Sequence, residues 1–373
     1  MIQRAIQKRV EDSLFKAKII VIYGARQVGK TTLVKNIQSK YQENSSYLNC
    51  DEPDIRSALT EKTSTELKAF LGNKRLVILD EAQRVKNIGL TLKLMADNFP
   101  ATQIIATGSS SFELSNKIAE PLTGRKYEYH LFPFSIEELK SLRADPEIDR
   151  LLERMMVFGM YPAIALAKTD AEKELKELAK SYLYKDALQY QNIKNPEVLE
   201  KMLQALALQI GNEVSYNELA DLLGIDKKTV AAYIRILEQA FIIFRLNPFS
   251  RNLRNELRKL RKVYFYDLGI RNVLINNLNP LDLRQDAGVL WENFMISERM
   301  KRNNNHASDV RSYFWRTKQK QEIDYLEEAG GELSGFEFKW KNDKARIPKP
   351  FLEAYPKSKV KLINKNSYHG FVE

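Results

Sequence analysis

The chain has 373 residues, of which 44% are hydrophobic and 29% charged; this composition excludes a disordered or collagen-like chain and favours two or three globular domains. Its 59 Lys and Arg against 48 Asp and Glu give a net charge of +11, which favours an anionic partner such as nucleic acid without selecting one. The longest apolar runs are far shorter than a membrane span of roughly 20 residues. The N-terminus has no secretory-signal pattern, and the single cysteine, Cys50, suits a reducing compartment. We therefore expect a cytoplasmic protein without membrane contact.

The first third of the chain alternates short apolar strands with helical or polar segments, which predicts βαβ units around a parallel sheet. The expected strands are Ile19–Tyr23, Tyr47–Leu48, Leu76–Leu79 and Gln103–Thr107. From Pro133 the apolar spacing becomes three and four, which is typical of helices. Near the C-terminus a helix, Val289–Arg302, is expected before four strands: Tyr313–Arg316, Glu322–Leu326, Gly335–Trp340 and Val360–Ile363.

A phosphate-binding loop is predicted directly after the first strand. Residues 24–31 fit G-x-x-x-x-G-K-[ST] and precede the helical run Thr32–Gln38. Backbone N–H groups of such a loop surround phosphate, Lys30 reaches the β- and γ-phosphates, and the Thr31 hydroxyl can ligate Mg²⁺. The residues expected to bind the nucleotide are Gly24, Ala25, Arg26, Gln27, Val28, Gly29, Lys30, Thr31 and Thr32. The alternative is a glycine-rich turn without a ligand.

Two acids, Asp80 and Glu81, end the strand Leu76–Leu79. The sheet would bring Asp80 to the Mg²⁺ and Glu81 to a water that faces the γ-phosphate, which predicts hydrolysis. The guanine-specific patterns Asp-x-x-Gly and Asn-Lys-x-Asp are missing, because Asp80 precedes Glu-Ala-Gln and Asn116-Lys117 precedes Ile-Ala. We therefore expect ATP with Mg²⁺.

With these motifs the chain resembles the prokaryotic AAA+-type P-loop ATPases whose C-terminal domain, formerly of unknown function, is related to PD-(D/E)XK nucleases. The matching segments span nearly the whole chain: residues 24–31, 79–83, 106–111, 122–125, 132–135, 159–162 and 265–267. The resemblance implies that Ser109 or Ser110 senses the γ-phosphate. It also implies that Arg125 is an arginine finger acting on a neighbouring subunit, or a sensing arginine, and hence a homo-oligomer in the ATP-bound state. A surface salt bridge is the alternative for Arg125.

Residues 215–238 have the helix, glycine turn and second helix of a helix-turn-helix, with Ser215 and Asp226 as N-caps. The side chains expected to pack inward are Leu219, Leu222, Leu223, Val230, Ile234 and Leu237. Those expected on the solvent face, in contact with nucleic acid, are Lys227, Lys228, Tyr233 and Arg235. A wing strand, Phe241–Leu246, would follow, and a basic run would contact phosphates: Arg251, Arg254, Arg258, Lys259, Arg261 and Lys262. The alternative is a winged helix that serves as a lid or spacer.

Two of the C-terminal strands carry acids that strand alternation can bring together. Asp324 lies on one strand, and Glu337 and Lys339 share one face of the next. Two carboxylates and a carbonyl can hold Mg²⁺ or Mn²⁺, while a lysine positions the attacking water. This is the PD-(D/E)XK arrangement, with Ile323 in place of the proline, and Glu292 resembles the upstream acid of such folds. Surface acids on a hairpin are the alternative.

The expected fold is α/β in four parts: a P-loop parallel-sheet ATPase domain (1–132), a helical lid or linker (133–198), a winged helix-turn-helix (199–275) and a restriction-endonuclease-like domain (276–373). The favoured function is ATP hydrolysis whose nucleotide state controls a metal-dependent, nuclease-like domain acting on nucleic acid, with DNA favoured. The alternative is a binding switch in which that domain only binds nucleic acid or serves as a scaffold. A small-molecule kinase is disfavoured, because most of the chain follows the P-loop and no substrate lid is recognisable.

Overall fold

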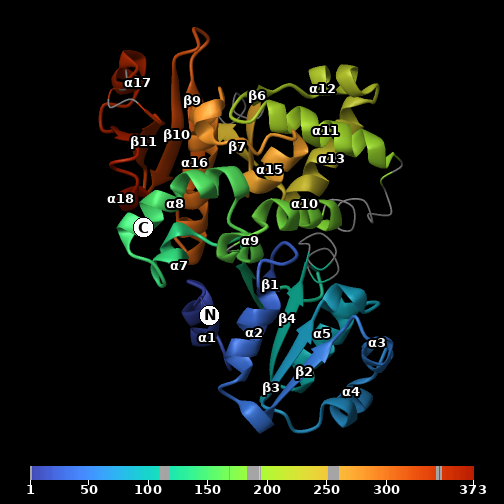
Figure 1. The fold of residues 1–373 in the computed structure, drawn as a ribbon. Coiled ribbons are helices and arrows are strands. Elements are labelled where there is room, and N and C mark those ends of the chain that lie inside the picture. Colours follow the sequence, from blue (N-terminus) through green and yellow to red (C-terminus); the bar gives the residue numbers. More distant parts are fainter. Residues whose placement is uncertain are drawn as a thin grey trace. The chain divides into compact units, whose positions relative to one another are not determined.

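The computed structural model describes residues 2–109, 114, 118, 120–167, 169–182, 193, 195–250, 260–341, 344 and 347–373. The chain divides into two compact units (Figure 1). Unit 1 comprises Met1–Pro133 with Gln239–Phe241, and unit 2 comprises Phe134–Glu238 with Ile242–Glu373. Among the described residues, no helix is long and apolar enough to cross a membrane.

Unit 1 contains a parallel sheet of five strands in the order β2-β3-β4-β1-β5. These strands are β1 (Ile19–Tyr23), β2 (Ser45–Asn49), β3 (Leu76–Asp80), β4 (Gln103–Gly108) and β5 (Lys126–His130). All residues of β1, β3 and β4 are buried, as expected for central strands of a parallel sheet. The edge strand β5 was missed, because its sequence, Lys-Tyr-Glu-Tyr-His, is polar and only partly buried. The α-helices among the described residues of this unit are α1 (Gln7–Asp12), α2 (Lys30–Gln38), α3 (Pro53–Leu59), α4 (Ser64–Leu71) and α5 (Ile88–Asn98).

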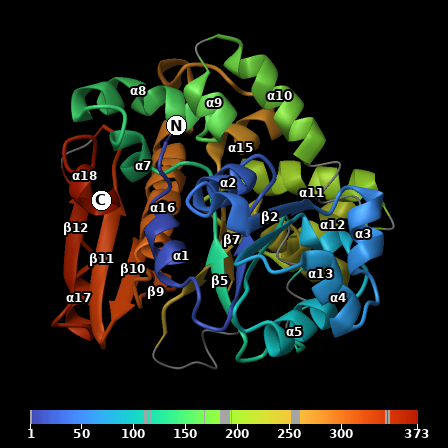
Figure 2. The ribbon, with the colours of Figure 1, turned by 90° about the horizontal axis from the view of Figure 1, so that it is seen from below.

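Unit 2 contains a sheet of seven strands in the order β12-β11-β10-β9-β7-β8-β6. They are β6 (Glu213–Val214), β7 (Ile243–Pro248), β8 (Arg261–Phe265), β9 (Arg311–Arg316), β10 (Glu322–Ala329), β11 (Glu332–Phe338) and β12 (Lys359–Ile363). Figure 2 shows β12, β11, β10 and β9 side by side. The boundary expected at residue 276 does not divide this unit. Asn247 and Pro248 of β7 pair in parallel with Tyr313 and Phe314 of β9, so β7 and the C-terminal strands form one sheet.

The helices of unit 2 begin with the expected helical region: α7 (Ile136–Lys140), α8 (Asp145–Phe158), α9 (Pro162–Leu166), α10 (Ala171–Tyr182) and α11 (Pro196–Leu208). They continue with α12 (Tyr216–Leu223), α13 (Lys227–Gln239), α15 (Leu268–Leu274), α16 (Ala287–Asn305), α17 (Lys349–Ala354) and α18 (His369–Val372). The fold is therefore mixed α/β, with a P-loop-type parallel sheet followed by further helical and sheet regions.

Two segments that carry the family resemblance, 159–162 and 265–267, meet in the core of unit 2. The Asp267 carboxylate accepts hydrogen bonds from the backbone N–H groups of Met160 (2.7 Å) and Ile270 (3.2 Å). Gly159 has φ +82°, and a Cβ there would lie 2.1 Å from Asp267 Oδ1. Burial raises the pKa of Asp267. These residues thus form a structural joint between the end of α8 and the start of α15.

Candidate functional sites

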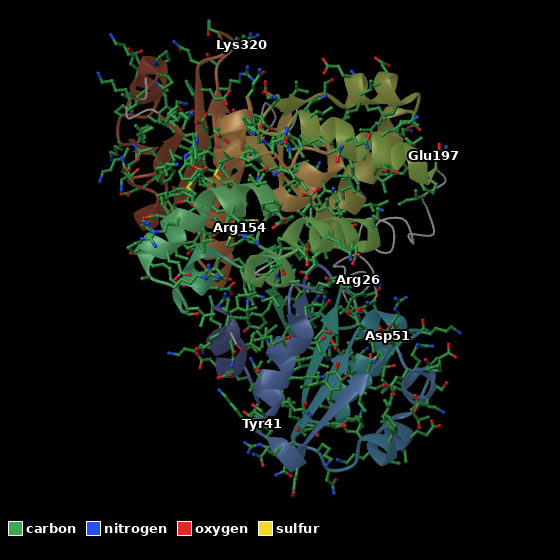
Figure 3. The ribbon with its side chains drawn as sticks, in the orientation of Figure 1. Arg26, Tyr41, Asp51, Arg154, Glu197 and Lys320 are labelled. Atoms are coloured by element: carbon green, nitrogen blue, oxygen red, sulfur yellow. The ribbon has the colours of Figure 1, made fainter. Side chains whose placement is uncertain are left out.

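The phosphate-binding loop lies at the carboxyl end of the parallel sheet. In Figure 3 the labelled Arg26 and Asp51, which follow β1 and β2, mark this end, and Tyr41, which precedes β2, marks the other. The loop passes through positive φ at Gln27 (+60°) and Gly29 (+97°), and α2 begins at Lys30. A Cβ on Gly24 would lie 2.2 Å from the carbonyl oxygen of Leu131, so only glycine fits there. The local sequence thus produces the predicted strand, loop and helix.

Lys30 is buried inside this loop. Its Nζ donates to the carbonyl oxygens of Gly24 and Ala25, both at 2.9 Å, and lies 3.9 Å from Glu81 Oε1. The ammonium group is therefore held where the loop surrounds a phosphate, next to the glutamate expected to act as the base.

The two expected Mg²⁺ ligands of the ATPase unit are in direct contact. The Thr31 hydroxyl donates to Asp80 Oδ2 at 2.7 Å, and the Tyr47 hydroxyl donates to the same oxygen at 2.5 Å. The Thr107 hydroxyl donates to Asp80 Oδ1. Burial and the neighbouring Asp80 carboxylate raise the pKa of Tyr47, so it remains a neutral donor. An adjacent hydroxyl and carboxylate are the hard oxygen ligands that suit Mg²⁺.

Glu81 is oriented by its neighbours. Its φ is +53°, and its backbone N–H donates to Thr107 Oγ1 at 3.1 Å. Gln83 Nε2 donates both to Glu81 Oε2 (2.5 Å) and to Ser109 Oγ (3.0 Å). Ser109, one of the two sensor candidates, is therefore linked to Glu81 through a single amide. The other candidate, Ser110, lies outside the described residues.

Arg125 lies away from the nucleotide site of its own chain. Its backbone oxygen accepts from the N–H of Ile19 at the start of β1, whereas the phosphate loop follows the end of that strand, about 15 Å away. Its Nε donates to Asp97 at 2.7 Å, in a half-exposed ion pair. The surface salt bridge named as the alternative is therefore present, and the finger and sensing roles of Arg125 stay predictions.

Sequence reasoning missed several residues that shape the nucleotide site. The buried Arg4 donates to the carbonyl oxygens of Val28 (2.5 Å) and Phe132 (2.6 Å), and so holds the loop from the N-terminal segment. A lone arginine before the first strand carries no pattern that predicts this. Thr107 and Gln83 lie within segments 106–111 and 79–83, which carry the family resemblance, and that position was the available signal. In the structure both side chains are buried.

The segment predicted as a helix-turn-helix contains the two expected helices, α12 and α13. Both expected caps are present, because Ser215 Oγ accepts from the N–H of Glu218 and Asp226 Oδ1 accepts from the N–H groups of Lys228 and Thr229. Leu222 is 67% exposed, although it was expected to pack inward.

Three of the four residues expected to contact nucleic acid, Lys227, Lys228 and Arg235, are exposed on α13. Tyr233 is the exception. It is only 5% exposed, because it lies three residues after Val230 and four before Leu237, on the helix face that packs into the core. Within the expected basic run, residues 251–259 lie outside the described residues, and Arg261 and Lys262 belong to β8.

The C-terminal acids form a cluster between β10 and β11. Tyr325 pairs with Phe336, so Asp324 and Glu337 occupy the next cross-strand positions. Lys339 Nζ lies 3.4 Å from Glu337 Oε2 and 3.8 Å from Asp324 Oδ2, and Asp324 Oδ2 accepts from the N–H of Phe338 at 2.9 Å. Glu337 is only 6% exposed, and among the described residues its Oε1 has no hydrogen-bond partner. The structure thus brings together the three residues expected at this site.

Glu292 of α16 borders the same cluster. Its Oε1 accepts from the Tyr264 hydroxyl (2.6 Å) and lies 3.2 Å from Lys262 Nζ. Burial, Glu292 and Glu337 together raise the pKa of Asp324 to about 8, and burial also raises the pKa of Glu337. Carboxylates whose ionised forms are disfavoured in this way are a common feature of cation sites.

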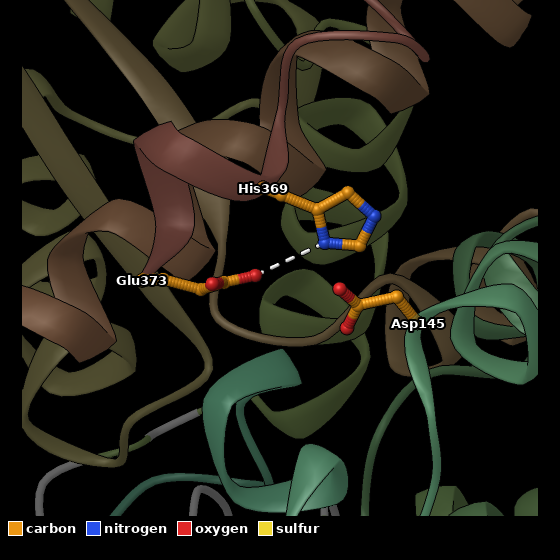
Figure 4. Close-up of side chains that lie close together, drawn as sticks. All are labelled: Asp145, His369 and Glu373. Atoms are coloured by element: carbon orange, nitrogen blue, oxygen red, sulfur yellow. Dashed lines mark hydrogen bonds and ion pairs between the residues drawn. The ribbon is translucent and has the colours of Figure 1, made fainter.

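A second group of potential ligands lies at the C-terminal end of the chain. Asp145, His369 and Glu373 place their ligand atoms within 4.8 Å of one another (Figure 4). Among the described residues, this group is the one whose ligand atoms all lie within 4.8 Å of one another. The ligand atoms of Glu292, Asp324 and Glu337 do not all lie within that distance. The Lys140 ammonium already pairs with Asp145 (2.8 Å) and Glu373 (2.7 Å), so this exposed group is an ion-pair network.

Comparisons with known proteins match the chain in three blocks. Residues 16–140 match the family described as AAA domain, residues 149–281 match a domain of unknown function (DUF8612), and residues 287–369 match another domain of unknown function (DUF4143).

The relatives include an uncharacterized protein of Methanocaldococcus jannaschii, 27% identical over 346 residues, which cover 87% of this chain and 75% of that protein. An uncharacterized protein of Mycobacterium tuberculosis is 25% identical over 344 residues, which cover 90% of this chain and 74% of that protein. Among solved structures, the Walker-type ATPase of Pyrococcus abyssi has a TM-score of 0.50 and 19% identity, and the match covers 74% of this chain and 96% of that one. That likeness shows the fold. Residues 16–140 thus match an AAA-type ATPase domain, and their fold and loop geometry are those of a P-loop domain.

Proposed function

We propose that the protein binds ATP with Mg²⁺ and hydrolyses it. The observation that carries this proposal is the direct contact of Thr31 with Asp80, beside a buried Lys30 that lies 3.9 Å from Glu81. The groups that we propose to hold phosphate, ligate the metal and activate water therefore lie close together, which supports the proposal. When bound, Mg²⁺ would neutralise charge on the β- and γ-phosphates.

The residues of the chain have distinct roles in this proposal. Backbone N–H groups of the loop bind the phosphates, and Lys30 exchanges its bonds to Gly24 and Ala25 for phosphate oxygens. Glu81 orients the attacking water and accepts its proton at the carboxylate. Gln83 and Ser109 keep that carboxylate in place.

Two substitutions test the assignment. Lys30→Ala is expected to abolish tight nucleotide binding, and Glu81→Gln to keep binding and lose turnover. Nucleotide titration and release of radiolabelled phosphate measure the two effects. The matched controls are Lys74→Ala and Glu43→Gln, because Glu43 precedes β2, Lys74 precedes β3 and both lie away from the loop. Hydrolysis by Glu81→Gln at the wild-type rate would show that Glu81 is not the base.

We further propose that Asp324 and Glu337 hold Mg²⁺ or Mn²⁺ and that Lys339 positions a water for attack on a phosphodiester, under control of the nucleotide state. Support comes from the opposed, buried carboxylates and from Glu337 Oε1, which has no hydrogen-bond partner among the described residues. Calorimetric titration with Mn²⁺ should detect uptake by the wild type that Asp324→Ala/Glu337→Ala loses. Slow cleavage of DNA or RNA should disappear in Asp324→Ala and in Lys339→Ala while ATP hydrolysis remains. Metal uptake without cleavage would leave a binding switch.

Nucleic acid is the proposed partner of the exposed face of α13. Its affinity should weaken with salt, because counterion release dominates phosphate contacts. Changing Lys227, Lys228 and Arg235 to glutamate should weaken duplex binding. The control changes three exposed lysines of α10: Lys173, Lys176 and Lys180. Equal losses in the two variants, measured by fluorescence anisotropy, would reduce the site to a general charge effect.

A further inference from the structure

Lys262 occupies a position that no phosphate-binding residue would have. Sequence analysis placed it in a solvent-exposed basic run, but on β8 it is only 2% exposed. Its Nζ lies 3.2 Å from Glu292 Oε1 and forms a close ion pair with Glu322 Oε1. Burying an ammonium group is costly unless charged partners surround it. The partners of Lys262 belong to the C-terminal carboxylate cluster, so its positive charge neutralises part of the negative charge of that cluster.

The cluster has an excess of negative charge. Its carboxylates are Glu292, Glu322, Asp324 and Glu337, and its lysines are Lys262 and Lys339. Arg316 contacts Glu322 at 3.4 Å but forms its shorter pair, 2.7 Å, with Glu213. With that pair counted as neutral, two formal negative charges remain, which one divalent cation balances. Two divalent cations would leave a positive excess in a buried site.

The geometry divides the cluster into two halves. On one side, Lys262 and the Tyr264 hydroxyl hold Glu292. On the other side, Asp324 and Glu337 face each other near the half-exposed Lys339, and Glu337 Oε1 has no partner among the described residues. Glu292 contacts Lys262, and Glu292, Asp324 and Glu337 do not all place ligand atoms within 4.8 Å of one another.

We propose that Lys262 is a built-in cation of this site: its ammonium takes the place of a second metal ion beside Glu292 and Glu322, so that the cluster binds one divalent cation, at Asp324 and Glu337. The proposal rests on the metal site proposed above and adds its stoichiometry and the residue that sets it. Lys262 is thus a positioning residue, which fixes Glu292 and Glu322 and leaves the other pair for the metal.

The experiment counts Mn²⁺ ions in the full chain by calorimetry and by electron paramagnetic resonance, in which two adjacent Mn²⁺ ions give a spin-coupled spectrum. Wild type should bind one Mn²⁺ at the cluster, with an uncoupled spectrum; Mn²⁺ at the nucleotide site is excluded by working without nucleotide. Lys262→Met should bind two, with a coupled spectrum, because Glu292 and Glu322 are released as ligands. Lys262→Gln removes the charge and shortens the side chain by one atom but keeps hydrogen-bond donors, so it should fold and also bind two. Lys339→Met is the control, because Lys339 lies in the other half of the cluster, near Asp324 and Glu337; this variant should bind one Mn²⁺.

Each result decides between the proposals. Two coupled ions in wild type, or a single ion in both folded Lys262 variants, would overturn the role of Lys262 while the metal site stands. No Mn²⁺ uptake by wild type would overturn the metal site itself. One ion in wild type and two in Lys262→Gln supports the inference even where Lys262→Met fails to fold.

Discussion

The hydroxyl of Thr107 connects the two acids of the nucleotide site, so its removal is a specific test of how that site is built. Thr107 is fully buried at the end of β4. Its Oγ1 donates to Asp80 Oδ1 and accepts from the N–H of Glu81 at 3.1 Å. Thr107→Val replaces the hydroxyl with a methyl group of similar size. The variant therefore removes two hydrogen bonds and leaves the shape of the side chain nearly unchanged.

The size of the effect follows from the bonds that are lost. A hydrogen bond to a charged group contributes about 1.5–3 kcal/mol, and each 1.4 kcal/mol corresponds to about a tenfold change in rate. The bonds of Thr107 to Asp80 and Glu81 keep both acids in position for catalysis, so kcat for ATP hydrolysis should fall about 10- to 100-fold when they are lost. Nucleotide affinity should change little, because the loop backbone and Lys30 bind the phosphates. The partly buried N–H of Glu81 loses its acceptor, so stability should fall by about 1–3 kcal/mol.

The assay compares steady-state phosphate release with nucleotide affinity for the folded variant. Thr102→Val is the matched control, because Thr102 also donates a hydrogen bond, to the Lys74 carbonyl at 3.0 Å, but precedes β4 at the opposite end of the sheet. A kcat within about twofold of wild type for folded Thr107→Val, or a loss confined to affinity, would refute this account.

Three further predictions address other parts of the chain. Gly159→Ala should lower the free energy of unfolding by at least about 2 kcal/mol, because φ is +82° and the new Cβ would lie 2.1 Å from Asp267 Oδ1, whereas Gly288→Ala, with no atom within 4 Å, should have little effect in the same denaturant titration. In metal-free buffer, the pKa of Asp324 is raised to about 8 in the folded protein. As the pH rises, this carboxyl therefore ionises at a lower pH in the unfolded chain than in the folded protein, which favours unfolding. The unfolding midpoint of wild type should therefore fall relative to Asp324→Asn from about pH 4 to pH 8, and a constant difference would contradict this. If Arg125 completes a neighbouring site, ATP turnover per subunit should rise with protein concentration and Arg125→Ala should remove the rise; turnover independent of concentration in wild type would exclude it.

Local patterns in the sequence were sufficient to predict the phosphate-binding loop and the position of the two acids that follow β3. Residues 24–31 form their loop because glycine positions, a preceding apolar strand and a following helix lie next to one another in the chain. The strand that ends in Asp80 and Glu81 pairs in parallel with its neighbours, so its acids reach the same edge as the loop. Alternation along a strand likewise predicted the faces of Asp324 and Glu337, because a two-residue period is a property of the backbone itself.

Tertiary structure decided the properties that depend on partners distant in the sequence. Tyr233 and Lys262 both have residue types that suit a nucleic-acid surface, yet both are buried, and the pairing of β7 with β9 joins two expected domains in one sheet. Arg4 and Thr107 act on the nucleotide site through contacts across 24 or more residues of chain. Whether a charged side chain faces solvent or an opposite charge depends on which strands become neighbours. That choice is made by the packing of the whole unit, because the cost of burying a charge is offset only where its partners converge.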